Sequence, residues 1–234
     1  MRYKVWSIFL CLKNFQSHFV FGSFFMKFFF PLFFLVSTCS VSAQKMITAD
    51  DKNWTDVTKL DKTIVIDIRY ATTNNFTQTK IYDCGKCYLR PEVAKAIAEA
   101  QKKVRQKGYG GFKMFDCYRP QLYQQRLWEK KPDKDYVTPP KKGSMHSRGS
   151  AVDLTLLDKD GNEIDMGTPY DTFSDKAHYD YQDLPKEILT QRQFLRRTLE
   201  QVGFSGIRTE WWHFSYNVKQ YKLSGVLWQC DGVK

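Results

Sequence analysis

The chain has 234 residues, of which 36 are Lys or Arg and 25 are Asp or Glu, so its formal net charge is +11. This length suffices for a domain with a sizeable hydrophobic core, or for two small domains. The basic residues are spread along the chain and are not interleaved with aromatic residues in a nucleic-acid-binding motif, so we expect no nucleic-acid partner.

The N-terminal segment has the pattern of a secretory signal. An apolar run, Phe28–Val36, follows Lys27 and precedes a stretch of small residues that ends at Ala43. The run is too short to span a bilayer as a helix. We therefore expect residues 1–43 to be a signal region that is removed on export, and residues 44–234 to form the mature domain without a stable membrane span.

Two further expectations concern this region. The lead before Met26 is unusually long for a signal peptide, so we expect Met26 to be the true start and the mature protein to be exported, to the periplasm. Lipidation of Cys39 is an alternative. Thr38 disfavours it, because a small Gly or Ala usually precedes a lipidated cysteine.

Cysteine usage agrees with export. The expected mature domain retains an even number of cysteines, which permits two disulfides with three possible connectivities; they are Cys84, Cys87, Cys117 and Cys230. The Cys84-Gly-Lys-Cys87 spacing also occurs in zinc ribbons and redox pairs. The chain has no second Cys-x-x-Cys and no thioredoxin-like context, so we expect a structural role.

The first half of the mature domain alternates between predicted strands and helices. Alternating isoleucines predict a strand over residues 62–70. Pro91 begins a predicted helix whose apolar face continues to Gly108. A strand over residues 112–118 and a second helix, from Pro120 to about residue 131, follow.

The second half begins after a loop rich in proline and lysine. Residues 151–157 predict a strand, followed by a hairpin turn and a return strand over residues 163–166. A long loop then leads to a third helix, from Pro185 to Gly203, and to a β-prone aromatic segment over residues 208–216. The fold class is therefore α+β, a single domain with a mainly antiparallel sheet and flanking helices.

Two stretches of the sequence carry candidate chemistry. The first contains His146 and Asp153, and the second contains Glu210 and His213. Two histidines and one carboxylate are a normal ligand set for catalytic zinc, and a further carboxylate beside the metal is the usual general base. In a regular strand Glu210 and His213 would point to opposite faces, so we expect a bend or bulge between them.

Three segments resemble, in order and spacing, the D-alanyl-D-alanine dipeptidases of the vancomycin-resistance type. They are Asp116–Pro120, Ser144–Asp153 and Glu210–His213, and the likeness begins at about Tyr70. The family comprises zinc peptidases that share their fold with D-Ala-D-Ala carboxypeptidases and with the hedgehog signalling domain. The chain departs from the family at Cys117, where glycine is usual.

The resemblance implies a catalytic centre with one zinc ion per chain. The expected zinc ligands are His146, Asp153 and His213. Glu210 would be the acid/base that activates a zinc-bound water, and Arg119 would stabilise the oxyanion. Without the resemblance, a residue that bridges a helix end is an alternative role for Arg119, which lies next to a proline.

The resemblance also implies a site for a small dipeptide. Tyr70 and Asp171 would hold the substrate's free ammonium group, and Ser144 would contact the dipeptide, although Asp171 also suits a turn or a helix cap. Trp211 and Trp212 are expected to pack around the site, and His178 to be structural or to lie behind the ligands.

The expected function is zinc-dependent hydrolysis of D-Ala-D-Ala, or of a related short D,D-dipeptide, to free amino acids. One alternative is a peptidoglycan D,D-carboxypeptidase or endopeptidase, which would need an open cleft in place of an ammonium pocket. Another is a non-catalytic binding module that contains zinc, which would need neither Glu210 nor Arg119. The sequence does not predict the oligomeric state.

Overall fold

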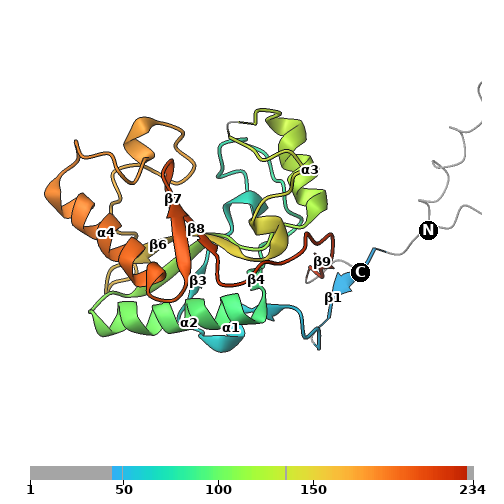
Figure 1. Cartoon of the computed structure of the whole chain (residues 1–234), viewed down its shortest axis with the longest axis horizontal. Coiled ribbons are helices and arrows are strands. Elements are labelled where there is room, and N and C mark those ends of the chain that lie inside the picture. Colours follow the sequence, from blue (N-terminus) through green and yellow to red (C-terminus); the bar gives the residue numbers. More distant parts are fainter. Residues whose placement is uncertain (1–43, 49, 135, 231–234) are drawn as a thin grey trace, which may run out of the picture. The chain divides into compact units, whose positions relative to one another are not determined.

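The computed structural model describes residues 44–48, 50–134 and 136–230 (Figure 1). The predicted signal region, residues 1–43, lies outside the described residues. Within the described part of the chain, no helix has both the length and the apolar character needed to cross a membrane.

A five-stranded sheet in the order β3-β5-β6-β8-β7 forms the centre of the fold. Its strands are β3 (Val65–Ile66), β5 (Gly111–Asp116), β6 (Ala151–Leu157), β7 (Phe204–Ile207) and β8 (Glu210–Tyr216). The β3–β5 pair is parallel and the other pairs are antiparallel, which confirms the predicted sheet type.

Two small strand pairs accompany this sheet. In one, β1 (Met46–Ile47) pairs in parallel with β9 (Leu227–Trp228). In the other, β2 (Thr55–Asp56) pairs antiparallel with β4 (Tyr88–Leu89). The second pair lies close in sequence to Cys87, and the first lies close to Cys230.

The α-helices of the described region are α1 (Val57–Leu60), α2 (Pro91–Gln106), α3 (Gln121–Lys130) and α4 (Lys186–Glu200). The three longer helices confirm the predicted ones, and each begins at or directly after a proline, whose fixed φ suits a first helical turn. Figure 1 shows α2 running below the sheet, where it packs against β5 and α4. Apolar side chains of α2 and α4 share one core with Val152, Leu154 and Leu156 of β6.

Two strand predictions differ from the structure. The strand over residues 62–70 is reduced to β3, because the chain leaves the edge of the sheet and forms a 3₁₀ turn at Arg69–Ala71 that buries Tyr70. The prediction of a return strand over residues 163–166 is wrong. The hairpin turn forms, but pairing is limited to one bridge between Leu157 and Glu163.

Strand β8 contains the predicted irregularity. Gly206 of β7 pairs with Phe214, whereas the next residue, Ile207, pairs with Glu210. Residues 211–213 therefore bulge out of the β7–β8 ladder. We refer to this feature as the β8 bulge.

The four cysteines form two disulfides, Cys84–Cys230 and Cys87–Cys117. This arrangement confirms the structural role predicted for the Cys-x-x-Cys segment. Each cysteine of that segment bonds to a different distant partner, so the segment is not a redox pair in this state.

Candidate active site

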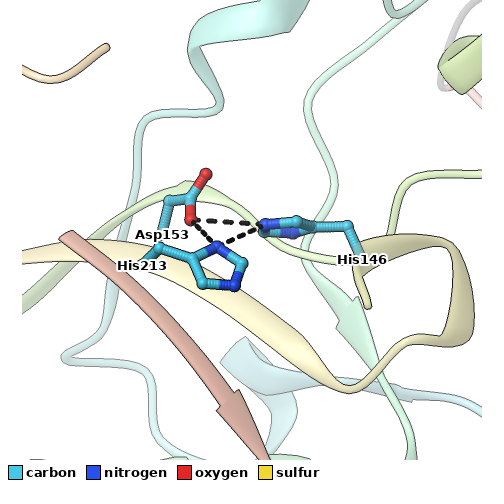
Figure 2. A group of neighbouring side chains, drawn as sticks. All are labelled: His146, Asp153 and His213. Atoms are coloured by element: carbon cyan, nitrogen blue, oxygen red, sulfur yellow. Dashed lines mark hydrogen bonds and ion pairs between the residues drawn. The ribbon is translucent and has the colours of Figure 1, made fainter. Parts of the chain in front are cut away.

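Three predicted metal ligands converge at the centre of the sheet (Figure 2). The β6–β8 register places Asp153 opposite His213, so that Oδ1 of Asp153 lies 2.9 Å from Nδ1 of His213. His146 enters from a 3₁₀ turn, and its Nε2 lies 3.1 Å from Nδ1 of His213 and 3.3 Å from Oδ1 of Asp153. The three donor atoms all lie within 4.8 Å of one another.

Each ligand is oriented by a second partner. Nδ1 of His146 lies 2.8 Å from the carbonyl oxygen of Cys117, so a proton on Nδ1 donates to this carbonyl and leaves the lone pair on Nε2. Nε2 of His213 lies 3.0 Å from Oγ of Ser215, which likewise leaves Nδ1 free to act as a ligand. Oδ2 of Asp153 accepts a hydrogen bond of 2.9 Å from Tyr170.

These residues fit a zinc ion. Two imidazole lone pairs and one carboxylate oxygen point at one another from buried or nearly buried side chains, and nitrogen and oxygen are donors that zinc accepts. Burial opposes a charge on Asp153, yet His146 and His213 hold the pKa of this carboxyl well below its usual range. A zinc ion held by these three donors would keep one position for a water or a substrate, as in catalytic zinc sites.

A glycine fixes the turn that delivers His146. Gly149 ends the 3₁₀ turn with φ +72°, and its N–H donates to the His146 carbonyl at 2.9 Å. A Cβ atom at this position would lie 2.3 Å from the Trp54 ring. A larger residue would therefore have to displace the ring and adopt a strained backbone.

Glu210 lies beside the ligands because of the β8 bulge. Its Oε2 is 3.9 Å from Nδ1 of His213, so both side chains reach the same side of the strand despite their odd spacing. Burial raises the pKa of the Glu210 carboxyl above its ordinary value, although His213 opposes the effect. The position and the raised pKa both suit a group that exchanges a proton.

Arg119 follows β5 and is held by a buried network. Its Nη2 donates to Oδ2 of Asp116 at 2.6 Å, its Nε lies 3.0 Å from the Tyr82 hydroxyl, and its Nη1 donates to Gln124 at 3.1 Å. The guanidinium also lies over the Tyr70 ring, 5.0 Å from its centroid. The network fixes the guanidinium and leaves one N–H on each terminal nitrogen for another partner.

Tyr70 and Asp171 meet at another part of the site. The Tyr70 hydroxyl donates to Oδ2 of Asp171 at 2.9 Å. Asp171 lies in the long loop after β6 with φ +57°, a left-handed conformation that Asp tolerates better than most residues. Burial and the nearby Asp153 raise the pKa of its carboxyl well above the usual range.

A cavity of about 210 Å³ joins these groups. All eight predicted site residues line it: Tyr70, Arg119, Ser144, His146, Asp153, Asp171, Glu210 and His213. Among the described residues of its wall, Arg119 is the only Lys or Arg, and Asp116 already neutralises it. Of the remaining carboxylates, Asp153 belongs to the metal donors and Glu210 lies beside them, so Asp171 is the carboxylate available to a cationic group elsewhere in the cavity.

Sequence reasoning missed the residues behind this first layer, among them Tyr82, Asp116, Gln124, Tyr170 and Ser215. Asp116 carried a signal, since a buried arginine next to a strand end needs a carboxylate partner.

His178 lies outside the cavity wall and contacts Arg208 at 3.1 Å. The buried rings of Trp211 and Trp212 agree with the predicted packing role.

A family model described as D-Ala-D-Ala dipeptidase matches residues 50–224. A D-alanyl-D-alanine dipeptidase of Escherichia coli (strain K12) is 34% identical over 183 residues, covering 78% of this chain and 94% of the relative. One from Enterococcus faecalis is 32% identical over 170 residues, covering 63% and 83%. A solved vancomycin-resistance D,D-pentapeptidase with Zn(II) is 16% identical with a TM-score of 0.38, covering 56% and 73%. The family match contains every predicted site residue.

Proposed function

The chain belongs to the D-alanyl-D-alanine dipeptidase family, and from this membership we propose that it hydrolyses D-Ala-D-Ala, or a related short D,D-dipeptide, to free amino acids. The observation that carries the proposal is the composition of the cavity. It combines three converging metal donors with a buried carboxylate beside them, a guanidinium held by hydrogen bonds and a second buried carboxylate in another part of the wall.

His146, Asp153 and His213 would hold one zinc ion per chain. When bound, zinc supplies Lewis-acid chemistry: it lowers the pKa of a bound water to about 7 and polarises a carbonyl. The protein's part is to keep these donors in place. The contacts of Nδ1 of His146 with Cys117 and of Nε2 of His213 with Ser215 support this role.

Glu210 would move the proton during hydrolysis. In the proposed reaction its carboxylate takes a proton from the attacking water and passes it to the nitrogen of the leaving amino acid. The raised pKa of this buried carboxyl supports the first step, because a carboxylate of low pKa is too weak a base to take the proton from water readily. The second step returns the proton to an amine, which is a stronger base than the carboxylate.

Arg119 would bind the negative oxygen that develops on the scissile carbonyl. Its Nε and Nη2 are fixed by Asp116 and Tyr82 and its Nη1 by Gln124, so the remaining N–H groups require no rearrangement to donate to that oxygen. Donors held in advance stabilise such a charge more than flexible donors do.

Asp171 and Tyr70 would bind the substrate's free ammonium, and Ser144 would contact the dipeptide. The position of Asp171 in the cavity wall, where it accepts a hydrogen bond from the Tyr70 hydroxyl, supports the first assignment. The second rests on position, since Oγ of Ser144 lies at the cavity wall within 3.3 Å of Gln124. A pocket that ends in a carboxylate favours a dipeptide over the longer, acylated substrate of a D,D-carboxypeptidase.

Incubation of the purified mature chain with D-Ala-D-Ala, with and without a metal chelator, tests the proposal. We expect release of D-alanine that the chelator abolishes and added zinc restores. Release that is insensitive to the chelator would contradict the zinc assignment. Cleavage confined to acylated stem peptides would instead indicate a carboxypeptidase.

We also propose that the mature protein is exported, to the periplasm. The two disulfides support this location, because disulfides persist mainly in oxidising compartments. Fractionation of cells that express the full chain tests the idea. Recovery of the uncleaved chain in the cytosol would refute it.

A further inference from the structure

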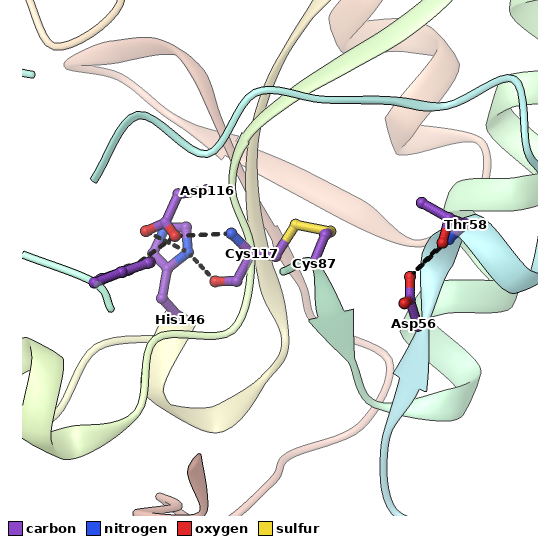
Figure 3. The surroundings of a disulfide bond; sticks show 7 residues. Asp56, Thr58, Cys87, Asp116, Cys117 and His146 are labelled. Atoms are coloured by element: carbon purple, nitrogen blue, oxygen red, sulfur yellow. Dashed lines mark hydrogen bonds and ion pairs between the residues drawn. A yellow bond between two sulfur atoms is a disulfide. The ribbon is translucent and has the colours of Figure 1, made fainter. Parts of the chain in front are cut away.

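The backbone of Cys117 contacts the candidate zinc site at both of its peptide groups (Figure 3). Its carbonyl accepts from Nδ1 of His146 at 2.8 Å, and its N–H donates to Oδ1 of Asp116 at 2.9 Å. The residue is completely buried and lies directly after β5. A displacement of Cys117 would therefore move a metal ligand's partner and the carboxylate that holds Arg119.

The side chain of Cys117 is tied to a different part of the fold. Figure 3 shows its disulfide to Cys87, which directly precedes β4. Cys87 is itself fixed, since its carbonyl accepts from Val57 at 3.1 Å, at the start of α1. The disulfide thus anchors the end of β5 to the β2–β4 pair, outside the central sheet.

We propose that Cys117, held by Cys87, is a positioning residue for the zinc ligand His146, and that the Cys87–Cys117 disulfide contributes to the affinity for zinc. The inference rests on the zinc assignment in the proposed function. Partners that orient a ligating histidine contribute about 10- to 100-fold to metal affinity. Here the partner of His146 is the backbone carbonyl of Cys117, which a side-chain substitution cannot remove. Loss of the Cys87–Cys117 disulfide can, however, allow this carbonyl to move away from Nδ1 of His146.

Two backbone contacts limit the size of the effect. The N–H of Tyr118 donates to Tyr88 at 3.0 Å, and the N–H of Arg119 donates to the His146 carbonyl at 3.1 Å. Both remain when the disulfide is absent. We therefore expect a folded protein with weakened zinc binding, and an effect at the lower end of the range for such orienting partners.

The second disulfide provides a matched control. Cys84–Cys230 closes a loop of 146 residues, against 30 for Cys87–Cys117, so its removal should cost at least as much stability through the unfolded chain. No described contact joins Cys84 or Cys230 to a candidate zinc ligand. A general loss of stability would therefore weaken zinc binding more in the control, whereas a positioning role would weaken it more in the Cys87–Cys117 variant.

The test compares zinc dissociation constants of three mature proteins by competition with a fluorescent chelator. These are the wild type, the Cys87→Ala/Cys117→Ala variant and the Cys84→Ala/Cys230→Ala variant. We expect the constant to rise about 10-fold in the first variant and by less than about 3-fold in the control. Equal constants in all three proteins, or a larger rise in the control, would overturn the proposal.

Two further arms keep the test decisive. If the first double variant does not fold, Cys87→Ala alone breaks the same bond while keeping the Cys117 side chain, and its zinc constant replaces the missing value. D-Ala-D-Ala hydrolysis is measured separately. A wild type that binds zinc but does not cleave the dipeptide would refute the proposed function and leave the positioning result standing, whereas a wild type that binds no zinc would overturn both.

Discussion

The phenolic oxygen of Tyr70 lies 2.9 Å from Oδ2 of Asp171, although 101 positions of sequence separate the two residues. Burial raises the pKa of this carboxyl well above its usual range. A cation beside Asp171 would reverse that effect, because an opposite charge favours the ionised form. The pair therefore marks the place where we expect the ammonium group of a substrate.

This placement predicts discrimination by the substrate's amino terminus. N-acetylation removes the ammonium and would leave Asp171 buried without a cationic partner, a loss that typically costs several kcal/mol. We expect kcat/KM for N-acetyl-D-Ala-D-Ala to be about 10²- to 10⁴-fold below that for D-Ala-D-Ala. Asp171→Asn should bring the kcat/KM values for the two peptides closer together, mainly by lowering the value for free D-Ala-D-Ala. Comparable values for the two substrates in the wild type would rule out the ammonium pocket.

Replacement of His213 should remove metal and activity together. With three protein donors, loss of one leaves too few to retain zinc. We expect His213→Ala to hold little zinc by elemental analysis after dialysis, and to be inactive. His178→Ala is the matched control, since His178 lies outside the cavity wall and should leave the zinc content unchanged. Full zinc occupancy in His213→Ala would refute the ligand assignment.

Replacement of Glu210 should separate the chemical step from metal binding. Glu210→Gln keeps the size of the side chain but cannot accept the proton, so we expect kcat to fall by about 10²- to 10⁴-fold. Zinc content should match the wild type, because the assigned donors are intact. A variant that loses zinc would instead identify Glu210 as a ligand.

Replacement of Arg119 by lysine tests the role of the fixed guanidinium. Lysine retains a positive charge near Asp116 but cannot reproduce the forked contacts to Asp116, Tyr82 and Gln124. We expect kcat to fall by about 10²- to 10³-fold, the usual cost of losing one oxyanion donor. The zinc constant should stay within error of the wild type. Unchanged kcat in this folded variant would refute the requirement for a forked guanidinium at this position.

A pH-dependent contribution to stability is expected at Glu92, which is not among the residues that line the cavity. Hydrogen bonds from Lys219 at 2.8 Å and Tyr221 at 3.0 Å accompany a lowering of its pKa to about 2, with the Lys219 contact as the largest cause. A carboxyl whose folded pKa is depressed stabilises the fold above its unfolded pKa, and this contribution is lost as pH falls through the folded pKa.

The measurement compares urea unfolding of the wild type and Glu92→Gln from pH 7 to pH 2. The wild type should be the more stable near neutral pH, and the difference should shrink below about pH 4.5 and be largely lost at about pH 2. The pair is partly exposed, so high salt should reduce the difference. A difference that grows as pH falls would contradict the assigned sign.

Local patterns in the sequence predicted much of this fold. The prolines before α2, α3 and α4 and the alternation in β6 each reflect constraints within one segment. The bulge in β8 was also predictable, because a common role for Glu210 and His213 is incompatible with strict alternation. The length of the edge strand β3 was overestimated. An edge strand extends only as far as its neighbour, here β5, offers hydrogen-bond partners, and the local sequence pattern does not show this distance.

Contacts between distant segments could not be predicted from local pattern. The pairing of the four cysteines depends on which segments the fold brings together, and spacing alone left three possibilities open. The hydroxyls of Tyr82 and Tyr170 reach Asp116 and Asp153 across 34 and 17 positions. No periodicity distinguishes these tyrosines from others that only pack in the core.

The β8 bulge also sets a constraint for protein engineering. Deleting one tryptophan between Glu210 and His213 would restore regular alternation and still direct the remaining acid and histidine to the same face. The two indoles, however, have different partners. Trp211 donates to Thr168 at 2.9 Å, three residues before Asp171, and Trp212 packs edge-on against Tyr170. Removal of Trp211 would keep Glu210 and His213 on one face but release Thr168 and the loop that carries Asp171, so selectivity for the amino terminus should deteriorate before zinc binding does. Removal of Trp212 would also disturb Tyr170, the partner of the zinc ligand Asp153.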